Sequence, residues 1–265
     1  MELLEVKELS RNFGGINAVD SLSFEAKTDN VTGIIGPNGA GKTTVFNLIT
    51  GVYKPTCGEI VFDSRNCTGL RPDIIVKTGI SRTFQNIRLF KRSTCLENVL
   101  TPILQRKECN ILSALFKLRK ARRAEREATE EAMSVLSAMG LSNEAKKVSG
   151  TLPYGLQRKL EIARAIAASP KLLLLDEPAA GMNPEETLSL VDLISEIRRK
   201  FNLTILLIEH HMDLVMNICD HIVVMESGRL LFRGVPDEVR HNEKVIEAYL
   251  GKTRKQTKDL RTGEF

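Results

Sequence analysis

Short apolar runs separated by turns occupy both ends of the chain, whereas a helical period of apolar residues fills the middle. Up to about residue 84, β-rich runs predict strands at Leu3–Lys7, Leu22–Ala26, Val31–Ile35 and Glu59–Phe62. From Lys171 onward, unbroken apolar runs predict strands buried on both faces of a parallel sheet, at Leu172–Leu175 and Thr204–Ile208. A final hairpin is predicted to join His221–Met225 to Leu230–Phe232. The chain is therefore expected to have an α/β fold.

Apolar residues at helical spacing predict the helices. Val45, Leu48 and Ile49 place one helix directly after Lys42, and Gly51 is its expected C-cap. Further helices are predicted at Asn98–Leu104, Ile111–Leu118, Arg122–Met139, Gln157–Ala168 and Pro184–Lys200.

The charge of the chain is mildly basic, with a formal net charge of +5 over 265 residues. This excess suits a nucleotide ligand or an anionic membrane surface. Nucleic-acid binders usually combine basic charge with aromatic residues, and here aromatic residues make up 5% with no Trp, so we expect no nucleic-acid partner. The basic segment Lys117–Arg126 is interpreted as a solvated helix face in preference to a specific anion contact. The polar, basic tail at 252–265 is expected to fray.

Neither end of the chain predicts membrane insertion or export. The first residues are acidic and carry no long apolar run, so they do not form a secretory signal. No stretch approaches the roughly 18 apolar residues that cross a bilayer. The five cysteines are odd in number and form no C-x-x-C pair, which is typical of free thiols in a reducing compartment. If the protein works at a membrane, another chain must span it.

A phosphate-binding loop is predicted between the strand at Val31–Ile35 and the helix after it. Its residues match G-x-x-x-x-G-K-[ST] without exception: Gly36, Pro37, Asn38, Gly39, Ala40, Gly41, Lys42 and Thr43. The glycines let successive N–H groups point inward at phosphate oxygens, and the helix N-terminus adds a favourable dipole. Lys42 is expected to reach the β- and γ-phosphates, the Thr43 hydroxyl to bind Mg²⁺, and Thr44 to donate to the α-phosphate. The alternative is a glycine-rich turn with no ligand.

Two carboxylates follow the buried strand at Leu172–Leu175. Asp176 is expected to hold Mg²⁺, directly or through a water, and Glu177 to orient and deprotonate the attacking water. Phosphoryl transfer needs charge neutralisation and an aligned nucleophile, which one acid on the metal and one on the water provide. Alone, an apolar run that ends in Asp-Glu could be a strand entering a loop. Together with the phosphate loop, it predicts ATP hydrolysis.

Further segments resemble the motifs of ABC ATPases in matching order and rough spacing, up to about Gly251. Phe13–Gly14 resembles the aromatic A-loop, Thr83–Gln85 the Gln loop, and Ile208–His210 the switch histidine. Five residues resemble the ABC signature segment: Leu152, Pro153, Tyr154, Gly155 and Leu156. Five others resemble the D-loop: Ala179, Ala180, Gly181, Met182 and Asn183.

Three segments are similar to the ATP-binding proteins of branched-chain amino acid importers beyond the general pattern: Arg82–Phe90, Glu177–Pro184 and Val245–Gly251. Urea-type or amide importers and the lipopolysaccharide-export ATPase remain alternatives, because the transported substrate is chosen by other subunits. A non-transport ABC protein of DNA repair or translation is the rival from another class. Repair ATPases tend to carry a very long coiled-coil insert and translation factors two ATPase units, whereas this chain has one unit and a modest helical lobe. A binding module with dead catalysis is a third alternative, which Glu177 and His210 disfavour.

The resemblance implies roles for three further side chains. Phe13 is expected to stack on adenine, with a place in the core as the alternative. Gln85 is expected to touch Mg²⁺ and sense the γ-phosphate. His210 is expected to hydrogen-bond the γ-phosphate; His211 is a rival for this role, and His210 is preferred because it follows Glu209 directly at the strand end.

The signature segment departs from the family pattern at Pro153, where Ser is usual. Proline offers neither a hydroxyl nor an N–H to a phosphate held by the opposite subunit. Leu156 in place of Gln is a second departure. The replacement of Ser by Pro153 is either tolerated or weakens one of two ATP sites. The second possibility favours a second ATP-binding subunit that differs from this chain.

The resemblance implies a P-loop ABC ATPase with a RecA-like core, an antiparallel β subdomain and a helical subdomain. The ABC domain is expected at 1–251, with the core and β subdomain at about 1–94 and 166–251 and the helical subdomain at about 95–165. ATP and Mg²⁺ are the implied cofactors. The implied partners are transmembrane permease subunits, a second ATP-binding subunit and, indirectly, a substrate-binding protein. The implied location is the cytoplasmic face of the plasma (inner) membrane, as a peripheral protein.

Overall fold

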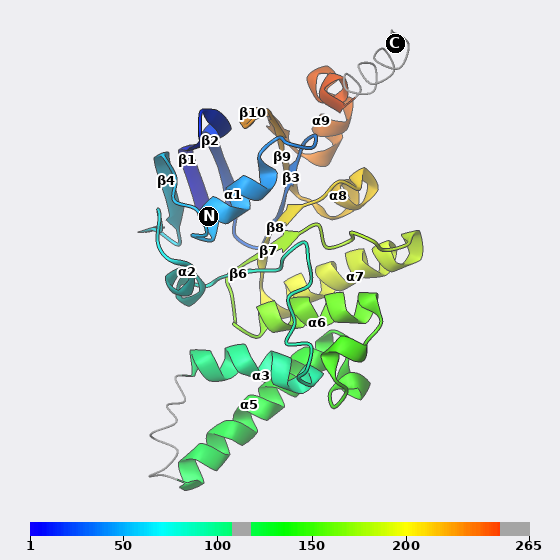
Figure 1. Ribbon diagram of the computed structural model, residues 1–265. Helices are drawn as coiled ribbons and strands as arrows, with labels where there is room; N and C mark the ends of the chain where they lie inside the picture. Colours follow the sequence, from blue (N-terminus) through cyan, green and yellow to red (C-terminus); the bar gives the residue numbers. More distant parts are fainter. Residues whose placement is uncertain (108–117, 250–265) are drawn as a thin grey trace, which may run out of the picture. The chain divides into compact units, whose positions relative to one another are not determined.

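The computed structural model describes residues 1–107 and 118–249 (Figure 1). The chain divides into two compact units. Unit 1 comprises Met1–Pro72 and the chain from Thr204 onward, and unit 2 comprises Asp73–Leu203. Among the helices of the described ranges, none combines the length and the apolar character needed to cross a bilayer.

Unit 1 contains an antiparallel sheet in the order β2-β1-β4-β5. Its strands are β1 (Glu2–Phe13), β2 (Ile16–Lys27), β4 (Cys57–Phe62) and β5 (Arg65–Asn66). Leu4, Val6 and Leu9 of β1 are buried, and β1 pairs with both β2 and β4. This pairing extends β1 and β2 well beyond the apolar runs that predicted them, because ladder hydrogen bonds continue where the side chains face water.

The same unit contains strands in the order β10-β9-β3-β8. They are β3 (Val31–Ile35), β8 (Thr204–Ile208), β9 (His221–Glu226) and β10 (Arg229–Gly234). β3 is parallel to β8 and to β9, and every residue of β3 and β8 is buried. Strands buried along their whole length therefore form the middle of this sheet. The helices of unit 1 are α1 (Lys42–Ile49), α8 (Met212–Ile218) and α9 (Pro236–His241), and residues 243–249 are also helical.

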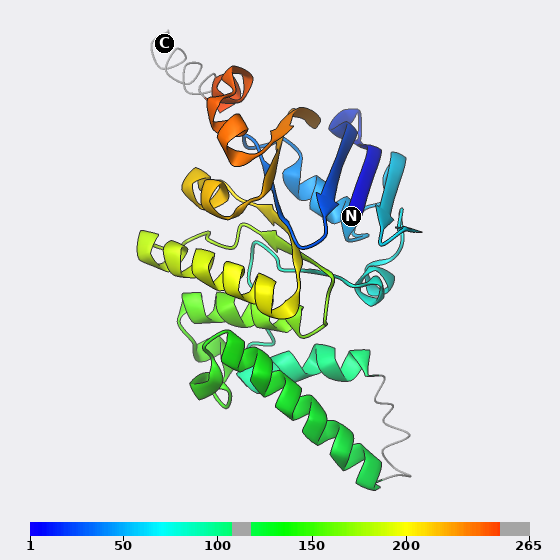
Figure 2. The ribbon, with the colours of Figure 1, turned by 180° about the vertical axis from the view of Figure 1, so that it is seen from behind.

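Unit 2 contains the parallel strand pair β6 (Ile80–Arg82) and β7 (Leu172–Asp176). Its helices are α2 (Pro72–Thr78, which starts at the unit boundary), α3 (Cys95–Arg106), α5 (Leu118–Ala138), α6 (Tyr154–Ile166) and α7 (Pro184–Phe201). Two 3₁₀ turns are η1 (Ser142–Glu144) and η2 (Ser149–Thr151). α3 packs against α5 and α6, as both ribbon views show (Figures 1 and 2).

The predicted strands and most predicted helices are confirmed, with shifted ends. α3, α5 and α6 each start several residues before the predicted helix. A capping box starts α3, and Pro153 is the N-cap of α6, where apolar periodicity gives no signal. α2, β6, α8 and α9 were not predicted from the pattern. Residues 111–117 of the predicted helix Ile111–Leu118 and the tail 252–265 lie outside the described residues. In the basic segment, Arg123 and Arg126 are exposed and pair with Glu127 and Glu130, as expected of a solvated helix face.

The described cysteines are free, and three of the four are buried. Burial raises the pKa of the Cys219 thiol to about 12. Its thiolate fraction at neutral pH is then about a thousandfold lower than that of an ordinary thiol. We expect a thiol reagent to modify exposed Cys57 in the native protein and to leave Cys219 unmodified until denaturant is added. Peptide mass mapping checks this, and rapid native labelling of Cys219 would contradict the burial.

Candidate functional site

The phosphate loop follows the carboxyl end of β3 and leads into α1. All three of its glycines have positive φ, among them 150° at Gly36 and 97° at Gly41. A Cβ at Gly36 would lie 2.1 Å from the backbone oxygen of Met225, and one at Gly41 would lie 2.2 Å from that of Ala18. Neighbouring strands therefore press on the loop from outside, and only glycine fits at these two positions.

Lys42 is the first residue of α1 and is 6% exposed. Its Nζ donates to the carbonyl oxygens of Gly36 (2.7 Å) and Pro37 (3.0 Å), so the ammonium group is held inside the loop. A buried ammonium group beside a helix N-terminus is suited to binding a phosphate. The charged phosphate oxygens would then accept the hydrogen bonds of the ammonium group in place of the carbonyl oxygens. Thr43 is exposed and Thr44 is half-buried on the first turn of the same helix. The loop therefore fits a nucleotide phosphate group.

A helix of the C-terminal region also contacts the phosphate loop. The pKa of Tyr249 is raised to about 12 by burial, and a hydrogen bond with the Gly36 backbone opposes the shift. The segment around Tyr249 resembles the family, but its sequence predicts no contact with the phosphate loop. In the structure this tyrosine supports the loop from the side of residues 243–249.

The candidate switch histidines follow the carboxyl end of β8. Because β8 is parallel to β3, with Ile34 opposite Ile208, the phosphate loop and the histidines lie at the same edge of this sheet. Glu209 is 1% exposed. Its carboxylate accepts from the His210 backbone N–H at 2.9 Å and lies 3.2 Å from Nδ1 of His211. The imidazole of His211 is thus tied to Glu209, and both histidines are exposed at the strand end. The switch role of His210 stays a prediction.

Phe13 ends β1 and is 36% exposed, so it is not a core residue. Its ring makes an edge-to-face contact with Tyr53, with 5.2 Å between centroids, and the Arg11 guanidinium lies 4.5 Å from its centroid. An aromatic face held by neighbours yet open to solvent can stack on a base. This placement is what the adenine role requires.

In unit 2, β7 ends at Asp176, which is 2% exposed. Arg82, at the end of the neighbouring β6, donates from Nη2 to Oδ2 of Asp176 at 2.7 Å. Burial raises the pKa of Asp176, and Arg82 opposes the shift. Within the described residues no cluster of three or more His, Cys, Asp or Glu forms a metal cage. Mg²⁺ does not need such a cage, because it usually binds one or two carboxylates together with substrate phosphates.

Glu177 and Gln85 are brought together at the same edge of unit 2. Gln85 Nε2 donates to Glu177 Oε2 at 2.8 Å, across a separation of 92 residues. Glu177 has φ 47°, a left-handed conformation that is uncommon for a residue with a side chain. Strained residues of this kind cluster at functional sites. The amide of Gln85 thus holds the carboxylate that was predicted to activate water.

The signature segment immediately precedes and begins α6. Pro153 is the N-cap of α6 and provides no side-chain cap, and α6 starts three residues before the predicted helix. Leu152 is buried, whereas Tyr154 is 46% exposed. Asn183, the last D-loop residue, caps α7 in a capping box with Glu186. Gly155 and Leu156 lie in the first turn of α6, whereas Ala180, Gly181 and Met182 lie in the turn that precedes α7.

Three charged residues of unit 2 were not recognised as site residues from the sequence. Arg82 pairs with Asp176, and Arg158 pairs with Glu161 inside the protein. Arg158 and Glu161 are i,i+3 neighbours on α6, a spacing that could have been noticed. Their burial could not, since charged residues are mostly exposed in folded proteins.

Comparison with known proteins decides the family. The model of the ABC transporter family matches residues 19–180, which is more than half of the 265 residues. The chain belongs to the ABC transporter family. The model of the branched-chain amino acid ATP-binding cassette transporter matches residues 229–254.

Relatives of this ABC chain match it over nearly its whole length. The high-affinity branched-chain amino acid transport ATP-binding protein BraF of Pseudomonas aeruginosa is 49% identical, over 94% of this chain and 98% of the relative. The corresponding protein LivG of Escherichia coli K12 is 47% identical over the same shares. The crystal structure of the ADP conformation of an ATP-binding cassette superimposes with a TM-score of 0.82 at 34% identity, covering 95% of this chain and 99% of that one. The expected α/β fold of an ABC ATPase is confirmed, and the chain is an ATP-hydrolysing transporter subunit.

Proposed function

We propose that this subunit powers the import of branched-chain amino acids by hydrolysing MgATP. The relatives named for that transport cover almost the whole chain, and the matching C-terminal model at residues 229–254 supports the same substrate class. The observation that carries the catalytic part is Glu177, a carboxylate in a left-handed backbone conformation that is held by Gln85. Urea-type, amide or lipopolysaccharide transport is the alternative outcome of the test below.

Each part of the proposed chemistry is assigned to particular residues of this chain. Lys42 and the N–H groups of the phosphate loop bind the β- and γ-phosphates, and Thr44 donates to the α-phosphate. Glu177 accepts a proton from the attacking water, and His210 positions the γ-phosphate. Phe13 stacks on the adenine.

The metal site is proposed at Thr43, Gln85 and Asp176. A bound Mg²⁺ supplies charge neutralisation for the transferring phosphate. In the structure Arg82 provides the positive charge beside Asp176. Metal binding to Asp176 therefore requires this ion pair to rearrange or to share the carboxylate.

Permease subunits are proposed to dock on unit 2 beside the Gln loop. A groove of about 330 Å³ lies there. It is lined by Val76, Ser81, Arg82, Phe84, Arg88, Pro102, Glu161, Arg164, Ala165 and Ala168. A short helix of the permease suits such a groove. This docking places the protein at the cytoplasmic face of the inner membrane, and a substrate-binding protein is reached only through the permease.

A second ATP-binding subunit is proposed to complete each ATP site, with the signature of one chain facing the nucleotide of the other. Pro153 gives this chain a signature without a hydroxyl, so the partner subunit is proposed to be a different chain. ATP favours the closed pair because the γ-phosphate contacts both chains, and ADP favours the open pair.

Pro153→Ser tests the role of this departure. A serine at the N-cap position can accept from N–H groups of the first turn of α6, so we expect the free energy of unfolding to rise by about 1 kcal/mol. We also expect faster ATP hydrolysis by the assembled complex. Denaturant titration and ATPase assays measure the two effects; a stabilised protein with an unchanged rate would show that Pro153 does not limit an ATP site.

Uptake of labelled leucine tests the proposed function. Cells that lack this gene are complemented with the wild-type chain or with Glu177→Gln, and labelled urea serves as the competing substrate. Leucine uptake restored only by the wild type supports the proposal. Restored urea uptake without leucine uptake would replace the substrate, and no effect on either would refute the import role.

A further inference from the structure

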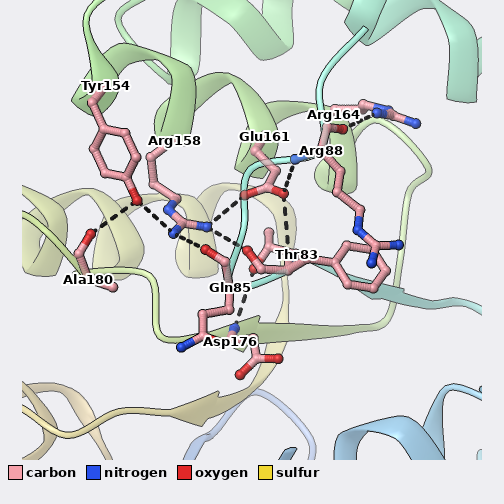
Figure 3. A network of polar contacts seen from close by, with 10 residues as sticks. Thr83, Gln85, Arg88, Tyr154, Arg158, Glu161, Arg164, Asp176 and Ala180 are labelled. Carbon is pink, nitrogen blue, oxygen red and sulfur yellow. Dashed lines mark hydrogen bonds and ion pairs between the residues drawn. The ribbon is translucent and has the colours of Figure 1, made fainter.

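One side-chain network in unit 2 connects three loops whose roles are otherwise separate. We propose that Tyr154, Arg158 and Glu161 form a positioning relay that fixes the signature segment and the D-loop to the Gln loop. All three residues project from the first turns of α6 towards the Gln loop (Figure 3). The relay rests on the proposed function for the meaning of these loops, but its contacts are independent of any nucleotide.

The centre of the relay is a buried ion pair. Arg158 is 0% exposed and donates from Nη1 to the Glu161 carboxylate at 2.8 Å. Two further hydrogen bonds go to main-chain oxygens, those of Phe84 (2.7 Å) and Gln85 (2.9 Å). A buried guanidinium is stable only when such partners satisfy it, so the Gln-loop backbone is part of what keeps Arg158 inside.

Glu161 contacts the same loop by accepting hydrogen bonds from backbone N–H groups of the loop. Its Oε1 accepts from the backbone of Arg88 at 3.1 Å and, more weakly, of Phe84 at 3.4 Å. Arg164, one turn further along α6, donates to the carbonyl oxygen of Arg88 at 2.6 Å. Residues 84–88 are thus held at both ends by main-chain contacts to one helix, which sets the direction in which the Gln85 side chain leaves the loop.

Tyr154 extends the network to the D-loop. Its hydroxyl accepts from Arg158 Nη2 and donates to the carbonyl oxygen of Ala180, each at 3.2 Å. Its ring also packs on Gly181, where a Cβ would lie 3.7 Å from the ring edge. Figure 3 shows this chain of contacts running from Ala180 through Tyr154 and Arg158 to the Gln-loop backbone.

The relay has a mechanical consequence. The hydroxyl of Tyr154 joins the D-loop to the Gln loop through Arg158. A displacement of Ala180 therefore changes the hydrogen bonding of Arg158 and so the position of Gln85, which holds Glu177. Tyr154 and Arg158 act through Gln85 and are positioning residues.

Amide hydrogen exchange of the nucleotide-free full chain tests the relay, with Tyr154→Phe as the variant. Phenylalanine keeps the ring and removes only the hydroxyl, so we expect an unchanged melting temperature and about threefold or faster exchange at residues 84–88 and 179–182. Thr129→Val is the matched control, because its hydroxyl bonds only to a carbonyl oxygen of α5, that of Glu125. The double variant Tyr154→Phe with Arg158→Lys shows whether Tyr154 acts through Arg158. We expect it to exchange no faster at residues 84–88 than Arg158→Lys alone.

Kinetics provide the functional readout. We expect Tyr154→Phe to lower kcat for ATP hydrolysis about threefold to tenfold, with KM for ATP within twofold of the wild type, because the phosphate loop is not part of the relay. Unchanged exchange at residues 84–88 would overturn the relay, and so would additive effects of the two substitutions. Absence of ATP hydrolysis in the wild type would refute the proposed function alone, since exchange decides the relay without nucleotide.

Discussion

Glu177→Gln is expected to lower kcat for ATP hydrolysis by about a hundredfold or more, because an amide cannot accept the proton of the attacking water. Binding of ATP is expected to stay within about twofold. The new amide oxygen can still accept the hydrogen bond from Gln85, so the end of β7 keeps its geometry. Steady-state ATPase assays and equilibrium binding of a fluorescent ATP analogue measure the two quantities.

The matched control is Glu196→Gln, the same chemical change at an exposed position of α7. It is expected to leave both quantities unchanged. Lys42→Ala should instead weaken ATP binding, since it removes the ammonium group held in the phosphate loop. Hydrolysis lost in Lys42→Ala but retained in Glu177→Gln would contradict the assigned roles.

The assembly state of Glu177→Gln gives a further result in the same experiment. Because unhydrolysed ATP favours the closed pair, ATP-dependent dimers seen by light scattering only in this variant would show that the chain pairs with itself. ATP binding without dimers would support a different partner subunit. Pro153 leads us to expect the second result.

Gly41→Ala is expected to have a large effect on the fold of the phosphate loop. The new Cβ would lie 2.2 Å from the Ala18 backbone oxygen, and φ at this position is 97°. The neighbouring atom belongs to a strand backbone and cannot turn away as a flexible side chain can. We expect the free energy of unfolding to fall by about 3 kcal/mol or more, and ATP binding to fall by at least about a hundredfold.

Gly15→Ala separates backbone strain from collision in this prediction. Gly15 has nearly the same φ, 93°, but a Cβ there would meet no atom within 4 Å. Its expected cost is only the strain of a left-handed alanine, about 1 kcal/mol. Denaturant unfolding followed by circular dichroism measures both variants, and equal losses of stability would mean that the loop yields and the collision with Ala18 is relieved.

Much of the fold followed from local pattern because the middle strands of the parallel sheet are buried on both faces. Val31–Ile35 and Thr204–Ile208 were predicted with their observed ends, since each is a short run in which apolar and β-branched residues predominate. β6 and α8 were missed because three residues or two turns give too few positions for a period to show. The ends of β1 and β2 were missed because pairing between strands extends them.

The candidate site was predictable where one short segment carries the chemistry. The phosphate loop requires glycine at Gly36 and Gly41 because backbone atoms lie close by, and this requirement is visible in the sequence as the glycine motif. The burial of Arg158 cannot be recognised from any sequence motif. Its acceptors on Phe84 and Gln85 are main-chain oxygens 74 and 73 residues away, which any residue type could supply.

The sequence by itself determined the class of chemistry, because phosphate binding and water activation each depend on residue types in a fixed local order around Lys42 and Glu177. The tertiary structure alone decided which side chains hold those groups in place. Arg82 meets Asp176 across 94 residues, and Gln85 meets Glu177 across 92. Such contacts form only when parallel strands far apart in the chain end at the same edge, since a side chain's partner is set by the packing of the backbone and not by its neighbours in sequence.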